Sequence, residues 1–231
     1  MNPIQQECER RGITRLCHFT QSRNMAHIFD EPYGLYSTRT LRANDMPHNP
    51  TDTNRYDGRD DLVCCSIEYP NTYYFARVHD LDHLFKDWVV LYIEPDYLWH
   101  PETEFCPCNS ARECGLQIRN GLEGFQSLFA LTSPGISFTR NSRHLPAAPT
   151  DIQAEVLVAD PIPLESVTGV AVQSDEQAQR EYSRLRLQGI SLDIPIYVVP
   201  EFFHRRTLSR SIQNGIRLTE TLYNDGGRHG R

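Results

Sequence analysis

Gln153-Ala154-Glu155-Val156-Leu157-Val158 combines a strand pattern with an unexpected charge. Its aliphatic and β-branched residues predict a β-strand, and Ala159-Asp160-Pro161 would end that strand. Glutamate is rarely buried unless it is paired, so one interpretation of Glu155 is a functional carboxylate. In the other, Gln153, Glu155 and Leu157 share the exposed face of an edge strand, because side chains alternate along a strand. The spacing alone leaves both interpretations open.

Two long polar segments flank the apolar strands, one over residues 42–61 and one over residues 139–151, just before Glu155. Loops of this length in a compact domain are usually functional or disordered. The first contains Arg55, in Asn54-Arg55-Tyr56-Asp57-Gly58. Most loop arginines are simply solvated, although an arginine can also bind a phosphate through two nitrogens.

The rest of the chain alternates between short apolar runs and a few helical patterns. Strands are predicted over 15–19, 34–36, 63–69, 88–93, 167–172 and 194–199, and helices over 22–29, from 73 onward, within 112–129 and over 176–187. The strands outnumber long helices and do not alternate regularly with them. This pattern predicts an α+β domain with mixed or antiparallel sheets.

Length and composition describe an ordinary globular protein of 231 residues, with 39% hydrophobic and 23% charged residues. No apolar run approaches the roughly 20 residues that span a bilayer. The polar start of the chain does not resemble a secretory signal, so we expect no membrane partner and a cytoplasmic protein. We place one domain over residues 1–200 and a polar, partly disordered C-terminal extension over residues 201–231.

The charge balance limits the kind of nucleic acid that the protein can bind. A net charge of −7 argues against a protein that coats a duplex, which needs a broad basic face. Lys86 is the single lysine, and all other basic residues apart from histidine are arginine. Codon bias of a GC-rich genome is the favoured explanation of this preference. The composition therefore permits a narrow groove lined by arginine without demonstrating one.

The seven cysteines are best interpreted as reduced thiols. Cys106, Cys108 and Cys114 suggest a zinc site, but their C-x-C-x₅-C spacing lacks a C-x₂-C pair and an obvious fourth ligand. We therefore predict no metal. A phosphate loop, a dinucleotide fingerprint and an H-E-x-x-H motif are also missing from the sequence.

Two further features have both a structural and a functional interpretation. His18 lies in a predicted strand, where a lone histidine is usually a hydrogen-bonded core residue. Tyr69, Tyr73, Tyr74 and Phe75 form an aromatic group that either packs in the core or offers a platform for a base or a nicotinamide ring.

Taken together, the segments resemble the DarT family of DNA ADP-ribosyltransferase toxins, in a divergent branch. The resemblance runs from about residue 15 to residue 199, and five pieces in order make it fairly specific. The matching segments are Leu16-Cys17-His18-Phe19-Thr20 with Asn24-Met25-Ala26-His27-Ile28, Asn54-Arg55-Tyr56-Asp57-Gly58, Ser66-Ile67-Glu68-Tyr69-Pro70-Asn71, Trp88-Val89-Val90-Leu91 with Phe105-Cys106 and Asn109, and Gln153-Ala154-Glu155-Val156-Leu157-Val158.

The resemblance implies a fold in which two sheets form a cleft that binds NAD⁺ in a bent conformation. His18 would hydrogen-bond the nicotinamide ribose, and the backbone near Phe19 and Thr20 would hold the carboxamide. Tyr74 or Tyr69 would stack on the nicotinamide ring, because a cationic ring favours an aromatic face.

The same resemblance assigns catalysis to Glu155 and Arg55. Glu155 would stabilise the oxocarbenium-like ribose left by nicotinamide and take a proton from the attacking base nitrogen. Arg55 would orient the acceptor base or bind the phosphates of NAD⁺. Arg140 and Arg143 would pair with phosphates of single-stranded DNA, and His144 would stack on a base.

The acceptor base, thymine or guanine, stays open at this stage. A duplex hides the acceptor nitrogen, so single-stranded or flipped DNA is expected. The resemblance also implies an antitoxin partner that removes ADP-ribose, a macrodomain or similar hydrolase. Three alternatives remain: a transferase acting on RNA or protein, a non-catalytic module that binds NAD⁺ or nucleic acid, and a small zinc-stabilised interaction domain.

Overall fold

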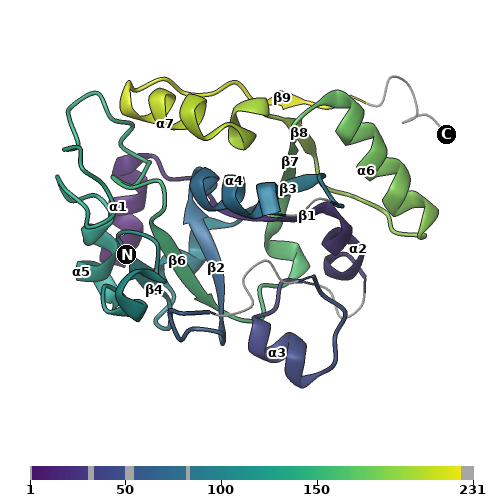
Figure 1. Cartoon of the computed structure of the whole chain (residues 1–231), viewed down its shortest axis with the longest axis horizontal. Coiled ribbons are helices and arrows are strands. Elements are labelled where there is room, and N and C mark those ends of the chain that lie inside the picture. The colour runs from purple at the N-terminus through teal and green to yellow at the C-terminus, as the bar shows by residue number, and fades with distance from the viewer. Residues whose placement is uncertain (1, 31–33, 50–54, 82–83, 225–231) are drawn as a thin grey trace.

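The computed structural model describes residues 2–30, 34–49, 55–81 and 84–224 (Figure 1). In this part of the chain nine strands form one sheet, in the order β5-β4-β6-β2-β1-β3-β7-β8-β9. The strands are β1 (Leu16–Gln21), β2 (Leu62–Ile67), β3 (Trp88–Ile93), β4 (Glu104–Cys106), β5 (Arg119–Asn120), β6 (Glu155–Ala159), β7 (Val167–Val172), β8 (Ile196–Val198) and β9 (Thr221–Leu222).

The centre of the sheet is β3, whose six residues are all buried. Its side chains alternate between two core clusters: Val89, Leu91 and Ile93 pack on one face, and Val90 and Tyr92 on the other. The strong β pattern of WVVLYI therefore reflects a strand covered on both faces. Only β7 and β8 pair in parallel, so the sheet is mixed, as the sequence predicts.

In the middle of the sheet, the pairing between β1 and β2 is short. These strands share two residue pairs, Leu16 with Ile67 and Cys17 with Ser66, whereas β1 and β3 share six. Beyond Cys17, β1 continues to pair with β3 but no longer pairs with β2. The predicted α+β class is confirmed, but the expected division into two separate sheets is not, because this short junction joins the halves.

Seven α-helices are found in the described residues: α1 (Pro3–Arg11), α2 (Met25–Ile28), α3 (Thr38–Ala43), α4 (Thr72–Leu81), α5 (Gly121–Ser127), α6 (Asp175–Leu187) and α7 (Arg205–Gln213). Short 3₁₀ turns are η1 (Ser22–Asn24), η2 (Pro95–Trp99), η3 (Arg112–Gly115), η4 (Leu164–Ser166) and η5 (Pro200–Phe203). Figure 1 shows α7 along the top of the view, α6 at the right, α1 and α5 at the left, and α3 at the bottom.

Most predicted elements are present, with two differences. The segment 34–36 contributes an isolated bridge between Leu35 and Ile162 instead of a strand. Within 112–129 the helical pattern covers only α5, because η3 and β5 precede it. No described helix is long and apolar enough to cross a membrane.

Residues 201–224 pack against the sheet. Phe202, Leu208 and Ile212 are buried, and β9 pairs with β8. Arg15 near the start of the chain forms an ion pair with Glu220 at 2.5 Å. The final GGRHGR motif lies outside the described residues. The segment after residue 200 therefore supplies part of the core as well as a polar surface.

Candidate active site

Glu155 is the first residue of β6 and lies opposite Cys106 of β4. Its side chain is buried, with 5% of the residue exposed. β6 lies between β4 and β2, so the interpretation of Glu155 as an exposed residue of an edge strand is wrong. The spacing could not reveal this, because the strand order is set by distant segments.

Neutral donors surround the Glu155 carboxylate. Asn109 donates its Nδ2–H to Oε1 at 2.9 Å. The amide and hydroxyl of Ser110 and the thiol of Cys64 are further hydrogen-bonding partners. Burial nevertheless raises the pKa of Glu155 to about 7, because the hydrogen bonds only partly offset the cost of desolvating a charge. A carboxyl with a pKa near neutrality in a site of this kind is a candidate for catalysis.

Arg55 is connected to Glu155 through other side chains. Its guanidinium donates to both oxygens of Asp57, at 3.1 and 3.0 Å, and also to the carbonyls of Leu62 and Arg59. Asp57 in turn accepts from the Ser110 hydroxyl at 2.9 Å. The chain of contacts runs from Arg55 through Asp57 and Ser110 to the catalytic candidate. Arg55 thereby fixes the loop that supports the carboxylate.

His18 lies on β1, across from Cys64. Its Nδ1 is 2.9 Å from the Cys64 carbonyl, which can only accept, so Nδ1 carries the proton. Burial lowers the pKa of His18 and keeps the ring neutral, which leaves Nε2 as an acceptor. Cys64 thus touches both candidates, His18 through its carbonyl and Glu155 through its thiol.

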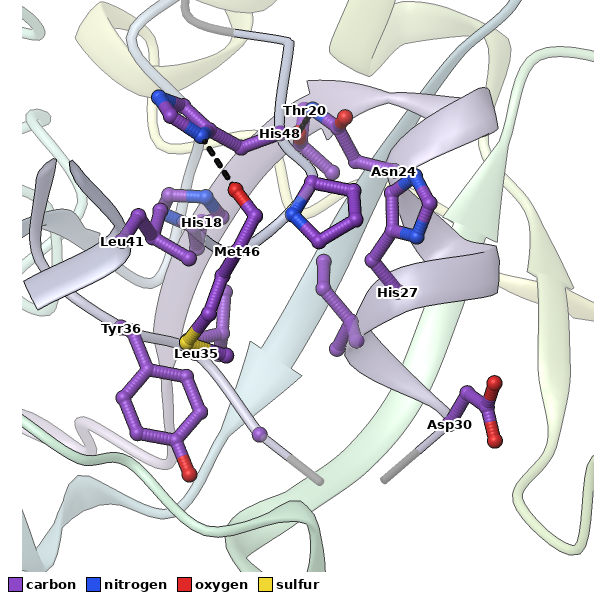
Figure 2. Close-up of a pocket in the computed structure, with 13 residues that line it drawn as sticks. His18, Thr20, Asn24, His27, Asp30, Leu35, Tyr36, Leu41, Met46 and His48 are labelled. Carbon is purple, nitrogen blue, oxygen red and sulfur yellow. Dashed lines mark hydrogen bonds between the residues drawn. The ribbon is translucent and has the colours of Figure 1, made fainter. Parts of the chain in front are cut away.

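A pocket of about 220 Å³ opens beside His18 and Thr20 (Figure 2). Asn24 donates to the Thr20 hydroxyl at 2.9 Å and accepts from the Asn49 amide at 3.1 Å, which ties the first long loop to β1. The other labelled side chains of its wall are His27, Asp30, Leu35, Tyr36, Leu41, Met46 and His48. The described part of the loop over 42–61 therefore contributes to a binding pocket.

Phe19, Tyr69 and Tyr74 lie on the other face of the sheet. The Phe19 ring centroid is 6.0 Å from that of Tyr74 and 5.8 Å from that of Trp88. Tyr69 packs edge-on against Phe202 at 6.1 Å. Alternation along β1 explains the separation, because successive side chains point to opposite faces. The structure thus places His18 and Thr20 at one pocket, whereas Phe19 packs with Tyr74 and Tyr69 packs with Phe202.

The loop before Glu155 is held together by its own polar groups. Arg140 donates to the carbonyls of Ala148 and Leu145 at 2.8 and 2.9 Å. Its pKa is lowered to about 10 by burial, so it stays cationic at neutral pH. His144 is buried, its Nε2 lies 3.0 Å from the Pro149 carbonyl, and its pKa is lowered to about 4. Arg143 is exposed.

The cysteines suggested as zinc ligands do not lie in one shared environment. Cys106 and Cys108 are buried, and Cys114 is exposed. Within the described ranges, no group of three His, Cys, Asp or Glu side chains has a metal-binding arrangement.

Four residues that support the site had no role predicted from the sequence: Asp57, Cys64, Asn109 and Ser110. Asn109 and Ser110 follow the short strand β4, whose register places Cys106 beside Glu155. In the sequence, only a polar Asn-Ser pair after a predicted strand could have indicated this support. The register of β4 against β6 is needed to show that the pair lies beside Glu155.

Cys64 thus links a buried carboxyl of near-neutral pKa to a neutral histidine on the neighbouring strand β1. The carboxylate suits stabilisation of a cationic sugar, and the imidazole suits a sugar hydroxyl. The site is that of an ADP-ribosyltransferase-like enzyme.

Comparison with known proteins identifies the family. The family model described as "ssDNA thymidine ADP-ribosyltransferase, DarT" matches residues 17–204, and the chain belongs to this family. It is an NAD⁺-dependent ADP-ribosyltransferase that modifies single-stranded DNA. No curated protein sequence matches the chain.

Solved structures agree in fold at low sequence identity. DarT of Thermus sp. 2.9 in complex with NAD⁺ has a TM-score of 0.59 and 13% identity, covering 83% of this chain and 98% of that one. The same enzyme with ADP-ribosylated single-stranded DNA has a TM-score of 0.56 and 13% identity, covering 84% and 97%. DarTG of Thermosipho africanus with ADP-ribose has a TM-score of 0.55 and 12% identity, covering 82% and 51%.

Proposed function

We propose that this enzyme transfers ADP-ribose from NAD⁺ to a thymine base of single-stranded DNA, with Glu155 as the catalytic carboxylate. The observation that carries the proposal is the burial of Glu155, which raises its pKa to about 7 although neutral donors hydrogen-bond its carboxylate. The family description names thymidine as the acceptor, which supports thymine over guanine.

The donor side is formed by β1 and the pocket of Figure 2. His18 Nε2 would accept a hydrogen bond from a hydroxyl of the nicotinamide ribose, because Nδ1 already donates to Cys64. Thr20, Asn24 and Tyr36 line the same pocket and would contact the rest of the dinucleotide. Beyond Cys17, β1 pairs with β3 but not with β2, so its backbone edge near Phe19 is available for the carboxamide.

In this proposal the aromatic rings lie behind the nicotinamide site and support it. Tyr74 packs against Phe19, and its amide is bonded to Asn71 Oδ1 at 3.0 Å, so the ring is fixed behind the backbone that would hold the nicotinamide. Tyr69 is anchored at Phe202. Stacking of either ring on nicotinamide stays a prediction.

In the reaction, the bond between the anomeric carbon and the nicotinamide nitrogen breaks, and its electron pair leaves with nicotinamide. Ionised Glu155 would stabilise the positive charge that develops on the ribose. A base nitrogen then forms a bond to that carbon and loses its proton, which Glu155 can accept because its pKa is near 7. The products are ADP-ribosylated DNA and nicotinamide.

Arg55 acts as a positioning residue in this account. Its bonds to Asp57 hold the carboxylate that accepts from Ser110, and Ser110 supports Glu155. A direct contact of Arg55 with the acceptor base or with the NAD⁺ phosphates would require it to exchange these bonds for others. Arg140 and His144 likewise shape the acceptor loop, and Arg143 is the exposed member available to a phosphate.

The biological setting follows from the family. A DNA-modifying enzyme of this kind would act as a cytoplasmic toxin and need a partner that removes ADP-ribose, a macrodomain or similar hydrolase. The DarTG protein of T. africanus in complex with ADP-ribose is consistent with such a pairing.

The test is incubation of the wild-type protein with NAD⁺ and single-stranded oligonucleotides that either contain one thymine or lack thymine, read by intact mass. The proposal predicts a gain of one ADP-ribose unit on the thymine oligonucleotide alone. Modification of guanine-only strands would contradict the base assignment. Modification of RNA or protein, with DNA untouched, would contradict the acceptor class.

A further inference from the structure

The sequence after the family match contains the most basic stretch of an otherwise acidic protein. Residues 202–219 include Arg205, Arg206, Arg210 and Arg217 and no aspartate or glutamate, whereas the chain as a whole has a net charge of −7. All four arginines are exposed. The family model ends at residue 204, so all four arginines lie outside the matched region.

The helix α7 carries Arg206 and Arg210 on the side opposite its buried residues. Leu208 and Ile212 are buried, and the Ile212 carbonyl accepts from the Leu145 amide at 3.0 Å. The helix is therefore fixed to the loop that precedes Glu155. At its start, the Arg205 guanidinium lies 5.7 Å from the centre of the Tyr73 ring, which connects α7 to α4.

A cavity of about 280 Å³ lies between α7, Tyr73 and the loop over residues 135–153. Tyr73 and Phe138 supply aromatic surface to its wall, and Ser209 and Gln213 of α7 form the opposite side. Gln153, two residues before Glu155, also lines it. This volume is near the lower end of small-ligand pockets, so it suits a single ring system.

Three lining residues have buried polar atoms with no hydrogen-bond partner in the described chain: His144 Nδ1, Asp151 Oδ2 and Ser209 Oγ. Asp151 is 1% exposed and His144 is 5% exposed. Buried polar atoms without partners are rare in folded proteins, and a functional role is one explanation for them. Their mixed donor and acceptor character matches the edge of a nucleobase better than a purely apolar ligand.

We propose that α7 and this cavity form the binding site for the single-stranded DNA acceptor, with phosphates on Arg206 and Arg210 and one nucleobase in the cavity against Tyr73. The inference rests on the proposed function and adds α7, which follows the family-matched region, to the acceptor site. Exposed arginines along a helix follow a phosphate backbone, and a ring beside them provides a stacking platform. An acidic protein can thereby bind DNA through one local surface.

The experiment measures binding of a fluorescent single-stranded oligonucleotide by anisotropy, over a range of salt concentrations. The double variant Arg206→Ala, Arg210→Ala should weaken binding about tenfold at low salt and reduce the salt slope by about 1.4, since each phosphate contact on a single strand contributes about 0.7. Arg186→Ala is the matched control, because Arg186 is an exposed helical arginine on α6. It should bind DNA as the wild type does.

A second pair of variants tests the cavity. Tyr73→Ala should raise the KM for DNA about tenfold, because loss of base stacking costs roughly 1–3 kcal/mol, and Tyr73→Phe should keep it. NAD⁺ affinity, measured by calorimetry, should be unchanged in every variant, and thermal unfolding reports whether each variant is folded.

The outcomes separate the two proposals. A wild-type enzyme that modifies DNA, with folded α7 and Tyr73 variants of unchanged DNA affinity, salt slope and KM, overturns this inference alone. A wild-type protein that neither binds nor modifies single-stranded DNA overturns the proposed function and this site with it.

Discussion

Glu155 and Glu68 are both buried glutamates in the same half of the sheet, yet their surroundings differ in kind. Glu68 follows β2, lies 3.7 Å from the Arg15 guanidinium and accepts from the Thr14 amide. Glu155 is held by Asn109, Ser110 and Cys64, all neutral. Burial raises the pKa of both carboxyls, but only Glu68 has an arginine to offset it.

This difference separates a structural carboxylate from the one that we propose for catalysis. Glu68 belongs to a cluster in which Arg15 also pairs with Glu220 and stacks 3.9 Å over Tyr92. That cluster joins the start of the chain to the C-terminal segment. A carboxylate without an arginine keeps its charge available for a cationic transition state, at a cost in stability.

The largest expected effect is on catalysis. Glu155→Gln should lower the rate of ADP-ribose transfer by about 10³-fold, because one electrostatic group aimed at the transition state contributes about 10²–10³-fold. Glu68→Gln should lower it less than tenfold. Initial rates of product formation, read by intact mass at saturating NAD⁺, make the comparison.

Equal loss of rate in both variants would mean that the two glutamates do not differ as described. Circular dichroism of each variant ensures that a low rate is not caused by an unfolded protein.

The second effect is on stability and depends on pH. The pKa of Glu155 is about 7 in the folded protein and 4.5 in the reference state, so the folded protein holds this proton more tightly. The stability it contributes is complete below pH 4.5 and is lost as pH rises through 7. Glu155→Gln should therefore be more stable than the wild type at pH 8, by on the order of 3 kcal/mol, and equal to it near pH 4.5.

Urea unfolding at the two pH values measures this difference. A Glu155→Gln advantage that is the same at pH 4.5 and pH 8 would show that ionisation of Glu155 is not its cause.

The third effect concerns the Glu68 region. Arg15→Met should destabilise the fold by about 2 kcal/mol, because Glu68 and Glu220 would lose their partner while partly buried. Transfer activity per folded molecule should change little. Chemical denaturation with a parallel activity assay tests both parts, and Arg10→Met, on an exposed ion pair of α1, serves as the control with an effect near zero.

The smallest effect is on the support of the catalytic group. Ser110→Ala should lower the rate about tenfold, because the hydrogen bonds of its hydroxyl with Asp57 and Glu155 are lost. It should also shift the apparent pKa of the reaction upward, since a bond that favours the charged carboxylate is removed. A rate loss without any shift in the pH profile would place Ser110 outside this role.

The sequence predicts the elements better than their arrangement. The six residues Trp88–Ile93 have a β pattern that no helix would favour, and β3 is where that pattern predicts a strand. Long-range pairing decides whether Glu155 is an edge residue or a buried one, and the order β4-β6-β2 is invisible in local spacing. For the same reason Asn109 and Ser110 could not be linked to Glu155.

The direction in which each side chain points is the second feature that the sequence does not predict well. His18 and Phe19 are adjacent in sequence, but alternation places one beside the donor pocket and the other in an aromatic cluster. Arg140 looked available for DNA, yet its guanidinium is bonded to the carbonyls of its own loop. The polar appearance of residues after 200 concealed Leu208 and Ile212, which two turns of an amphipathic helix bury.

In the proposed mechanism Glu155 acts in its ionised form, and its carboxyl has a pKa near 7. The pH dependence of kcat/KM for NAD⁺ in the wild-type enzyme tests it most directly, because this ratio reports the groups of the free enzyme. We expect kcat/KM to rise with pH and to level off above an apparent pKa near 7. The residual activity of Glu155→Gln should lack this pH-dependent step. A wild-type profile that is flat between pH 5.5 and 8.5, or a step retained in Glu155→Gln, would contradict it.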